Sequence, residues 1–411
     1  MKRAFFVIWF AVAASHLMGQ TPVASPAGDK PNPAPFGSSL KKYENKDWRK
    51  EGDDNETIRV ETALVINDVL VTAPDGSLIT SLKKEDLIVK DDGEPQDIEL
   101  FLSEASKPVP RAIVLIMGIL NAFDWSNYER KVRAAKQIVD DLGPNDEMAI
   151  VANDLRLLTD FTNDKTRLKD ALDVIAKKND WASFTVFGTL MAVVNEKFKA
   201  RSARPIIIVQ GAVSEIFEVK TDDDSFWNSS PFAQQFVKRY LEFTDIENAV
   251  KRSNVSLYNV ITTPQIFGRP RKEQLTTIKP LIRENSIFWY DRYLKFRLTQ
   301  PPFIPGVHHI SKERNVEEMQ KRLPDKSILF FSEHQRAMTR LADISGGASY
   351  FVEKPEDADA VYKKLSQTIK SRYTIGYYPK TSGTRGKPRS ISITVKDHPE
   401  YTVTTRTSYI P

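Results

Sequence analysis

The chain has no cysteine among its 411 residues. This absence excludes disulfide bonds, thiol catalysis, zinc–thiolate sites and a lipidated amino-terminal cysteine. Because disulfides are common in animal extracellular proteins, an exported chain of this length without any fits a bacterial envelope better. The hydrophobic content of 41% and the charged content of 27% are ordinary for a globular protein, and the length allows two to three domains.

The sequence also lacks the short motifs of nucleotide-binding and hydrolytic enzymes. It contains no Gly-x-Gly-x-x-Gly, no P-loop, no Gly-x-Ser-x-Gly and no His-Glu-x-x-His. The adjacent pair His308 and His309 would point its two rings in opposite directions on a strand. Ser345 in "DISGGAS" is interpreted as a helix-end residue and not as a nucleophile. We therefore expect no catalytic residue, no cofactor and no enzyme activity.

Only the amino terminus carries a long apolar run. "MKR" precedes "AFFVIWFAVAA", and small residues follow near Gly19, which is the pattern of a secretory signal peptide over residues 1–19. The apolar run of about a dozen residues is short for a membrane span of roughly 20 residues, although a retained anchor stays the alternative. We therefore expect a secreted or periplasmic protein without a stable membrane span after signal removal.

Two further segments differ in composition from the rest of the chain. Residues 20–56 are rich in Pro, Gly, Ser, Lys and Asp, and this predicts a disordered linker because so little apolar surface is available for burial. Residues 264–326 hold 13 basic and 7 acidic residues, a net of +6, whereas the whole chain carries +5. Such a local basic insertion does not indicate general nucleic-acid binding, and no nucleic-acid partner is expected.

Alternating patterns at both ends of the chain predict β structure. In residues 57–110, "IRVETALVINDVLVTA" has a period of two, "PDG" closes it as a turn, and a second hairpin is predicted around Asp92-Gly93. In residues 371–411, "YTIGYYP", "PRSISITV" and "YTVTTRTSYI" are predicted as three short strands. We expect the strands of the two ends to pair with each other in one β subdomain.

Between these ends, residues 111–370 predict a doubly wound α/β domain. The aliphatic run "AIVLIM" is typical of a buried parallel strand, and "EMAIVAN", "PIIIVQG" and "VSLYNVIT" are further strands. "LRLLTDF" is predicted as a hairpin partner of "EMAIVAN". Helices alternate with these strands: one opens with a capping box of Ser126 and Glu129, and "FAQQFVKRYLEFTDIENAVKRSN" is predicted as one long helix.

In order and spacing these segments resemble the bacterial, acidobacterial-type VWFA-related family, built on a von Willebrand factor A-type domain. The resemblance rests on "VLVTAPDGSLITSLKKEDLIVKDDGEPQDIELF", on "AAKQIVDDLGPNDEMAIVANDLRLLTDFTNDKTRLKDAL", on "LADISGGASYFVE" and on "RYTIGYYP" with the closing "TRTSYI". It runs from about Arg59 to Pro411. It implies an α/β fold: a von Willebrand A-like, Rossmann-type doubly wound sheet with a β subdomain formed from the N- and C-terminal strands.

The function of that family usually depends on a metal-ion-dependent adhesion site. One loop supplies Asp-x-Ser-x-Ser, a second supplies Thr and a third supplies Asp to a divalent cation. By resemblance, the corresponding positions of this chain are Met117, Ile119, Asn121, Thr185 and Gly211. Gly188-Thr189 is an alternative register for the second loop. Because a hard cation offered one amide and one hydroxyl keeps its hydration shell, we expect these vestigial loops to hold no metal.

Two alternatives to a lost metal site stay open. In the first, the nearby acids Asp124, Glu215 and Glu218 replace the missing aspartates. In the second, the motif is misaligned, although the strand "AIVLIM" leaves little room for another placement. The acidic stretch "KTDDDSFWNSS" lacks the alternate spacing and the turn glycine of a calcium loop, so we interpret it as a solvated loop.

The basic insertion also interleaves aromatic with basic side chains. One interpretation is an insertion that folds its aromatics onto the core. The other is a surface for a protein or cell-envelope partner. The residues of this candidate partner surface are Trp289, Tyr290, Arg292, Tyr293 and Arg297.

Taken together, these patterns predict an exported, non-catalytic protein-binding or scaffold protein with a vestigial, metal-free adhesion site. A second hypothesis keeps metal-dependent adhesion through substitute ligands. A third hypothesis is an envelope enzyme acting on peptide or glycan, for which the sequence offers neither a nucleophile–base pair nor paired carboxylates.

Overall fold

A computed structural model of the chain describes residues 35–41, 64–103, 109–118, 128–177, 186–198, 204–211, 219–220, 241–299, 311–322, 324–381 and 386–411. The elements below belong to one unit, Phe36–Pro411. The expected signal peptide, residues 1–19, and most of the expected linker, residues 20–56, lie outside the described residues. The limits 57–110, 111–370, 264–326 and 371–411 stay predictions.

The center of the unit is a six-stranded sheet with the order β12-β11-β8-β5-β6-β7. Its strands are β5 (Arg111–Met117), β6 (Glu147–Ala152), β7 (Leu157–Thr162), β8 (Arg204–Gly211), β11 (Ser256–Ile261) and β12 (Ala348–Phe351). All neighbours pair in parallel except β6 and β7. The chain starts in the middle at β5, winds to one edge, and then crosses back to wind to the other. This order confirms the expected Rossmann-type doubly wound sheet of the von Willebrand A kind.

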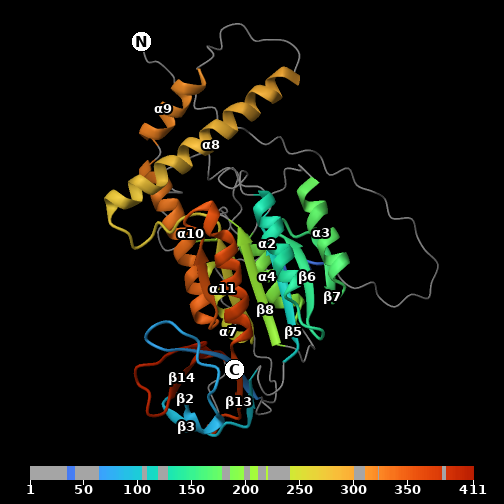
Figure 1. Cartoon of the computed structure of the whole chain (residues 1–411), viewed down its shortest axis with the longest axis vertical. Coiled ribbons are helices and arrows are strands. Elements are labelled where there is room, and N and C mark those ends of the chain that lie inside the picture. Colours follow the sequence, from blue (N-terminus) through green and yellow to red (C-terminus); the bar gives the residue numbers. More distant parts are fainter. Residues whose placement is uncertain are drawn as a thin grey trace, which may run out of the picture. The chain divides into compact units, whose positions relative to one another are not determined.

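Helices cover both faces of this sheet (Figure 1). One face packs against α2 (Tyr128–Asp140), α3 (Lys165–Lys177) and α11 (Ala358–Lys370). The other face packs against α4 (Val186–Glu196), α7 (Phe243–Arg252) and α10 (Pro324–Ile344). Every residue of β5 is buried, which explains why its sequence is continuously apolar rather than alternating.

The strands from the two ends of the chain form two antiparallel sheets. One has the order β15-β1-β13-β4 and the other β16-β14-β2-β3. The amino-terminal strands are β1 (Val65–Thr72), β2 (Leu87–Asp91), β3 (Glu94–Gln96) and β4 (Leu100–Leu102). The carboxyl-terminal strands are β13 (Tyr373–Tyr377), β14 (Arg389–Val395), β15 (Thr402–Thr404) and β16 (Ser408–Tyr409). Each sheet therefore mixes strands of both ends, as the expected β subdomain requires.

Inside this β subdomain, one hairpin follows its prediction and one strand does not. Asp92 and Gly93 join β2 to β3 with φ angles of 50° and 86°, the left-handed pair that a two-residue hairpin turn needs. The closing "YTVTTRTSYI" was expected as one strand, which was wrong, because β15 and β16 belong to different sheets. The chain crosses between them at Arg406, whose Nε donates a 2.8 Å hydrogen bond to Asn67.

The amino-terminal linker and the long helix also depart from expectation. Ser38–Leu40 form the 3-10 helix η1, and Glu196 accepts hydrogen bonds of 2.9 Å from the backbone N–H groups of Gly37 and Ser39. This part of the linker is therefore ordered against α4. Residues 232–240 of the segment predicted as one long helix lie outside the described residues. In its described part, Leu241–Glu242 is the strand β10, which pairs with β9 (Val219–Lys220), and the helix begins at Phe243.

The described part of the basic insertion is largely helical. It contains α8 (Arg271–Thr299) and α9 (Lys312–Arg322), and an apolar cluster that includes Ile278, Ile282 and Phe331 packs α8 against α10. The remaining short elements are the 3-10 helices η2 (Lys84–Asp86) and η5 (Pro355–Asp357). Within the described part of the chain, every helix is too short or too polar to cross a bilayer.

Candidate functional site

Parallel strands β5, β8 and β11 end at the same edge of the central sheet, which we call the carboxyl edge. Doubly wound folds usually bind ligands in the loops beyond this edge. Met117, the last residue of β5, is fully buried there, and its carbonyl accepts a 3.0 Å hydrogen bond from the N–H of Asn153. The position that the resemblance assigns to a metal-binding aspartate thus carries a buried thioether.

Directly beyond Met117, the ends of β5 and β8 approach each other closely. The N–H of Gly118 donates a 2.6 Å hydrogen bond to the carbonyl of Gln210. A Cβ at Gly118 would lie 2.8 Å from that oxygen and 3.0 Å from the Cα of Gly211. A side chain at Gly118 would therefore collide with the backbone of β8, whereas a Cβ at Gly211 would lie 3.3 Å from the Cα of Gly118. Gly211 has no side chain to offer a ligand. A glycine at a strand end is the sequence signal of such a close approach.

A small cavity of ≈ 20 Å³ lies behind this contact, between β8, β11 and α10. Its polar lining consists of backbone and of neutral side chains, among them Asn259 and His334. The Nδ2 of Asn259 donates hydrogen bonds to the carbonyl of Met338 at 2.7 Å and to Ser349 at 2.9 Å. Its Oδ1 and the Nδ1 of His334 are buried, with no partner among the residues that the structure describes.

Burial lowers the pKa of His334 to about 3, so its imidazole is neutral at neutral pH. The ring packs edge-on against Phe187 of α4 with a centroid distance of 5.5 Å. On the other face of the sheet, Gln210 donates a 2.9 Å hydrogen bond from Nε2 to the carbonyl of Lys131 on α2. The Lys131 side chain is buried, and burial lowers its pKa to about 7. This edge thus holds amides, an imidazole and a lysine.

The described residues at this edge do not fit a divalent cation. Mg²⁺ prefers about six oxygen ligands, with carboxylates to supply the charge, whereas no carboxylate lines the cavity. Within the described ranges, no group of three or more His, Cys, Asp or Glu is placed to hold a metal. Ile119, Asn121 and Thr185 lie outside the described residues, as do the proposed substitute acids Asp124, Glu215 and Glu218.

The alternative register for the second loop was wrong. Gly188 and Thr189 lie inside helix α4, and Thr189 is fully buried there. A side chain in that position packs within the apolar layer between helix and sheet. It does not belong to a loop that reaches a ligand at the carboxyl edge.

Ionised side chains gather instead at the amino edge of the central sheet, where β5, β8 and β11 begin. Arg204 donates a 2.5 Å hydrogen bond from Nε to Asp68 of β1, and Ser256 donates to the same carboxylate at 2.8 Å. Burial alone would lower the pKa of Arg204, but the charge and hydrogen bond of Asp68, together with those of Tyr258, outweigh burial and raise that pKa. Because Asp68 belongs to the β subdomain, this buried pair joins the β subdomain to the α/β domain.

A second pair lies at the same edge. Arg111 binds Asp146 through Nε at 3.0 Å and through a terminal nitrogen at 2.5 Å. Burial alone would raise the pKa of Asp146, but the hydrogen bonds and charge of Arg111 and the N–H of Gly143 lower it. This pair holds the start of β5 against the turn before β6.

A third buried carboxylate organises the β subdomain. Asp91 is fully buried and accepts hydrogen bonds from Arg389 at 2.7 Å, Tyr377 at 3.0 Å and Tyr409 at 2.9 Å. Burial and the neighbouring Asp91 raise the pKa of both tyrosines above the usual value for a phenol. Sequence reasoning missed Asp68 and Asp91. A signal for Asp91 exists, because it follows Leu87 and Val89 on the buried face of an alternating strand.

The candidate partner surface lies on helix α8. Trp289, Tyr290, Arg292, Tyr293 and Arg297 all belong to that helix. Among their side chains only that of Tyr290 is described, and it is half-buried. His308 and His309 and the acidic stretch at residues 222–224 lie outside the described residues. Ser345 follows the end of α10, where its hydroxyl donates to the carbonyl of Ala342 at 2.7 Å, as expected of a helix-end residue.

Comparison with known proteins finds solved structures of similar fold but no matching family. No protein-family model and no curated protein matches the chain. A von Willebrand factor type A structure from Catenulispora acidiphila is 9% identical, with a TM-score of 0.35, and covers 87% of this chain and 76% of its own. The chain has a von Willebrand A-type fold. This assignment rests on the strand order given above, and it agrees with the resemblance of the sequence to VWFA-related proteins.

Two further solved structures are similar to the chain. The vWF domain of the type V pili tip protein Mfa5 from Porphyromonas gingivalis is 9% identical, with a TM-score of 0.32 and coverage of 68% of this chain and 99% of that one. The conserved hypothetical protein BatB from Bacteroides thetaiotaomicron is 12% identical, with a TM-score of 0.32 and coverage of 63% and 98%. Likeness at this level says nothing about what this chain binds.

Proposed function

We propose that the chain is an exported, non-catalytic protein-binding or scaffold protein whose von Willebrand A-type domain no longer uses a metal. The observation that carries the proposal is the chemistry of the carboxyl edge. Met117 is buried at the first position and Gly211 offers no side chain at the third. The neighbouring cavity is lined by neutral polar groups and apolar side chains.

The arrangement of titratable groups supports a non-catalytic role. General acid–base catalysis needs a group that reaches substrate and whose pKa lies near the working pH. His334 is buried in a cavity of ≈ 20 Å³, which is too small for any substrate. Asp68 and Asp91 are held in buried hydrogen-bonded networks within the fold. These carboxylates stabilise the structure, so the envelope-enzyme hypothesis finds no support in the described residues.

The partner we propose is a protein or another component of the bacterial envelope. The signal-peptide pattern of residues 1–19 supports a secreted or periplasmic location. Helix α8 carries the candidate partner surface, and it projects a basic face that the central sheet does not use. Binding of this kind depends on shape and side-chain contacts, and a chelator leaves it unchanged.

Titration calorimetry of the purified full chain with Mg²⁺ and with Mn²⁺ tests the metal-free site. We expect no binding isotherm with either ion. An isotherm that EDTA abolishes would overturn the proposal and favour metal-dependent adhesion through substitute ligands. A pull-down from an envelope extract, run with and without EDTA, tests the binding role: we expect the same partner to be captured in both.

A further inference from the structure

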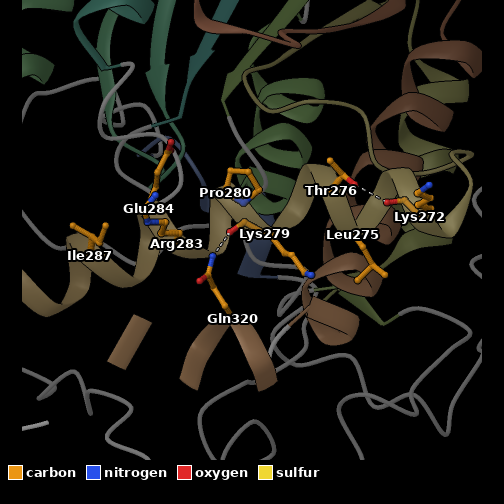
Figure 2. A pocket seen from close by; sticks show the side chains of 9 residues that line it. All are labelled: Lys272, Leu275, Thr276, Lys279, Pro280, Arg283, Glu284, Ile287 and Gln320. Atoms are coloured by element: carbon orange, nitrogen blue, oxygen red, sulfur yellow. Dashed lines mark hydrogen bonds between the residues drawn. The ribbon is translucent and has the colours of Figure 1, made fainter. Parts of the chain in front are cut away.

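A groove runs along helix α8 where α9 packs beside it (Figure 2). Its volume is ≈ 670 Å³, which lies within the range of about 300–1,000 Å³ typical of ligand sites. Gln320 of α9 donates a 3.4 Å hydrogen bond to the carbonyl of Lys279 on α8. The ion pair of Lys312 with Asp291, at 2.8 Å, also joins the two helices. The groove is thus formed by two helices that are held together by side-chain contacts.

Three cations line this α8–α9 groove: Lys272, Lys279 and Arg283. All three side chains are exposed. Their spacing of seven and then four residues places them on one stripe of the helix. Along the helix axis this spacing corresponds to about 10 Å and about 6 Å. A ligand that neutralises all three must therefore carry several negative charges along its length.

Other cations of the insertion already have carboxylate partners. Arg271 pairs with Asp325, Lys312 with Asp291 and Lys321 with Glu317. Among the described residues, no carboxylate forms such a pair with the three cations of the groove. The groove is lined by one acidic residue, Glu284. It therefore presents a surplus of positive charge that the fold itself does not neutralise.

The groove also has an apolar component. Leu275, Pro280 and Ile287 contribute to its lining between the cations. Pro280 lies inside α8 and has no N–H, so the carbonyl of Thr276 lacks its helical donor. Thr276 lines the groove as well. An apolar side chain and a backbone N–H of a ligand would both find a partner here.

We propose that the α8–α9 groove binds an acidic peptide segment of a partner protein. Its carboxylates pair with Lys272, Lys279 and Arg283, and one apolar side chain of the segment packs on Leu275 and Ile287. The proposal rests on the protein-binding function proposed above and names the surface and the chemistry of its partner. The apolar lining favours a peptide over a polyanion, which would present charge alone.

A fluorescent peptide of 14 residues, rich in Glu with one central Leu, is the probe for this site. Anisotropy titrations with the full chain are run in low and in high salt. We expect binding that weakens as salt rises, because exposed charges are screened. A peptide with Lys in place of Glu should not bind, and one with Ala in place of Leu should bind more weakly. Equal binding of the Leu and Ala peptides, or of heparin, would overturn the peptide assignment.

The charge-reversed double variant Lys279→Glu/Arg283→Glu tests the location. We expect its affinity for the acidic peptide to fall by at least roughly tenfold. The matched control is Lys363→Glu/Lys364→Glu on α11, which makes the same change in net charge at two exposed positions outside the groove. The control should bind as the wild type does. Equal losses in the two variants would show nonspecific attraction and overturn the proposal.

The pull-down separates this inference from the proposed function. A partner captured equally by the wild type and by Lys279→Glu/Arg283→Glu would overturn the groove and leave the protein-binding function intact. Loss of capture in this variant alone, with the α11 control retained, is the result we expect.

Discussion

The two edges of the central sheet hold different kinds of polar group. At the amino edge, Arg204 and Asp68 form a buried ion pair that joins the sheet to the β subdomain. At the carboxyl edge, Asn259 and His334 are neutral and line a small cavity. Doubly wound folds usually place their polar chemistry at the carboxyl edge. Among the described residues, the buried Arg204–Asp68 pair joins two parts of the chain, and at the opposite edge the ends of β5 and β8 meet in a close backbone contact.

The largest expected effect comes from breaking the buried pair at the amino edge. Replacing Asp68 by Ala leaves Arg204 buried without its counter-charge and removes an acceptor from Ser256. We expect a loss of about 3–5 kcal/mol in the free energy of unfolding, measured by chemical denaturation. The control is Asp173→Ala, which breaks a more exposed pair with Lys136 at 2.7 Å and should cost at most about 1 kcal/mol. Similar losses of unfolding free energy in both variants would contradict the conclusion that the buried pair stabilises the protein more than the exposed pair does.

An intermediate effect is expected at the carboxyl edge from Gly118→Ala. The new Cβ would lie 2.8 Å from the carbonyl oxygen of Gln210, and this backbone atom moves only if β5 and β8 separate. We expect a loss of about 1–3 kcal/mol in the free energy of unfolding, as for other overpacked interiors. At Gly211 a Cβ would meet the Cα of Gly118 at 3.3 Å, so Gly211→Ala should cost less. An unchanged free energy of unfolding in Gly118→Ala would contradict the close contact between the ends of β5 and β8.

The smallest effect at neutral pH is expected from His334→Leu, whose signature is the pH dependence of stability. The pKa of His334 falls from 6.5 in the unfolded chain to about 3 in the folded one. Between these values the unfolded state binds a proton that the folded state does not, so the wild type loses stability as pH falls below 6.5. The slope is about 1.4 kcal/mol per pH unit. The free energy of unfolding, measured by chemical denaturation at several pH values from 7 to 4, should fall less steeply in His334→Leu by this slope. The same fall with pH in the wild type and in the variant would contradict a buried neutral imidazole.

The parallel core was predictable from sequence because burial on both faces leaves a recognisable pattern. "AIVLIM" is apolar throughout and "PIIIVQG" contains the aliphatic run "IIIV", and each became a buried strand of the sheet. The Asp92-Gly93 turn was equally clear, because few residue pairs adopt two left-handed φ angles in succession. Such features depend on a few adjacent residues, so a short stretch of sequence is enough to predict them.

The features that sequence reasoning missed depend on contacts between distant segments. The role of Asp68 appears only when Arg204 and Ser256 are brought to it from two other strands. The helix α8 was not predicted, because it contains Pro280 and has no single apolar stripe along its 29 residues. At the candidate site, the sequence already places Met117 at the position that the resemblance assigns to an aspartate. The close contact of Gly118 with β8 was not visible in the sequence, because recognising it requires the register between β5 and β8.

The pairing of β1 with β13 has a consequence for the order of synthesis. Val65 lies opposite Tyr377 in that ladder, so a growing chain presents β1 long before its partner exists. At the usual translation rate this interval lasts about 15–60 s. During that time the strand has unpaired edges that favour association with other chains. The growing chain therefore exposes an unpaired β1 until β13 has been synthesised.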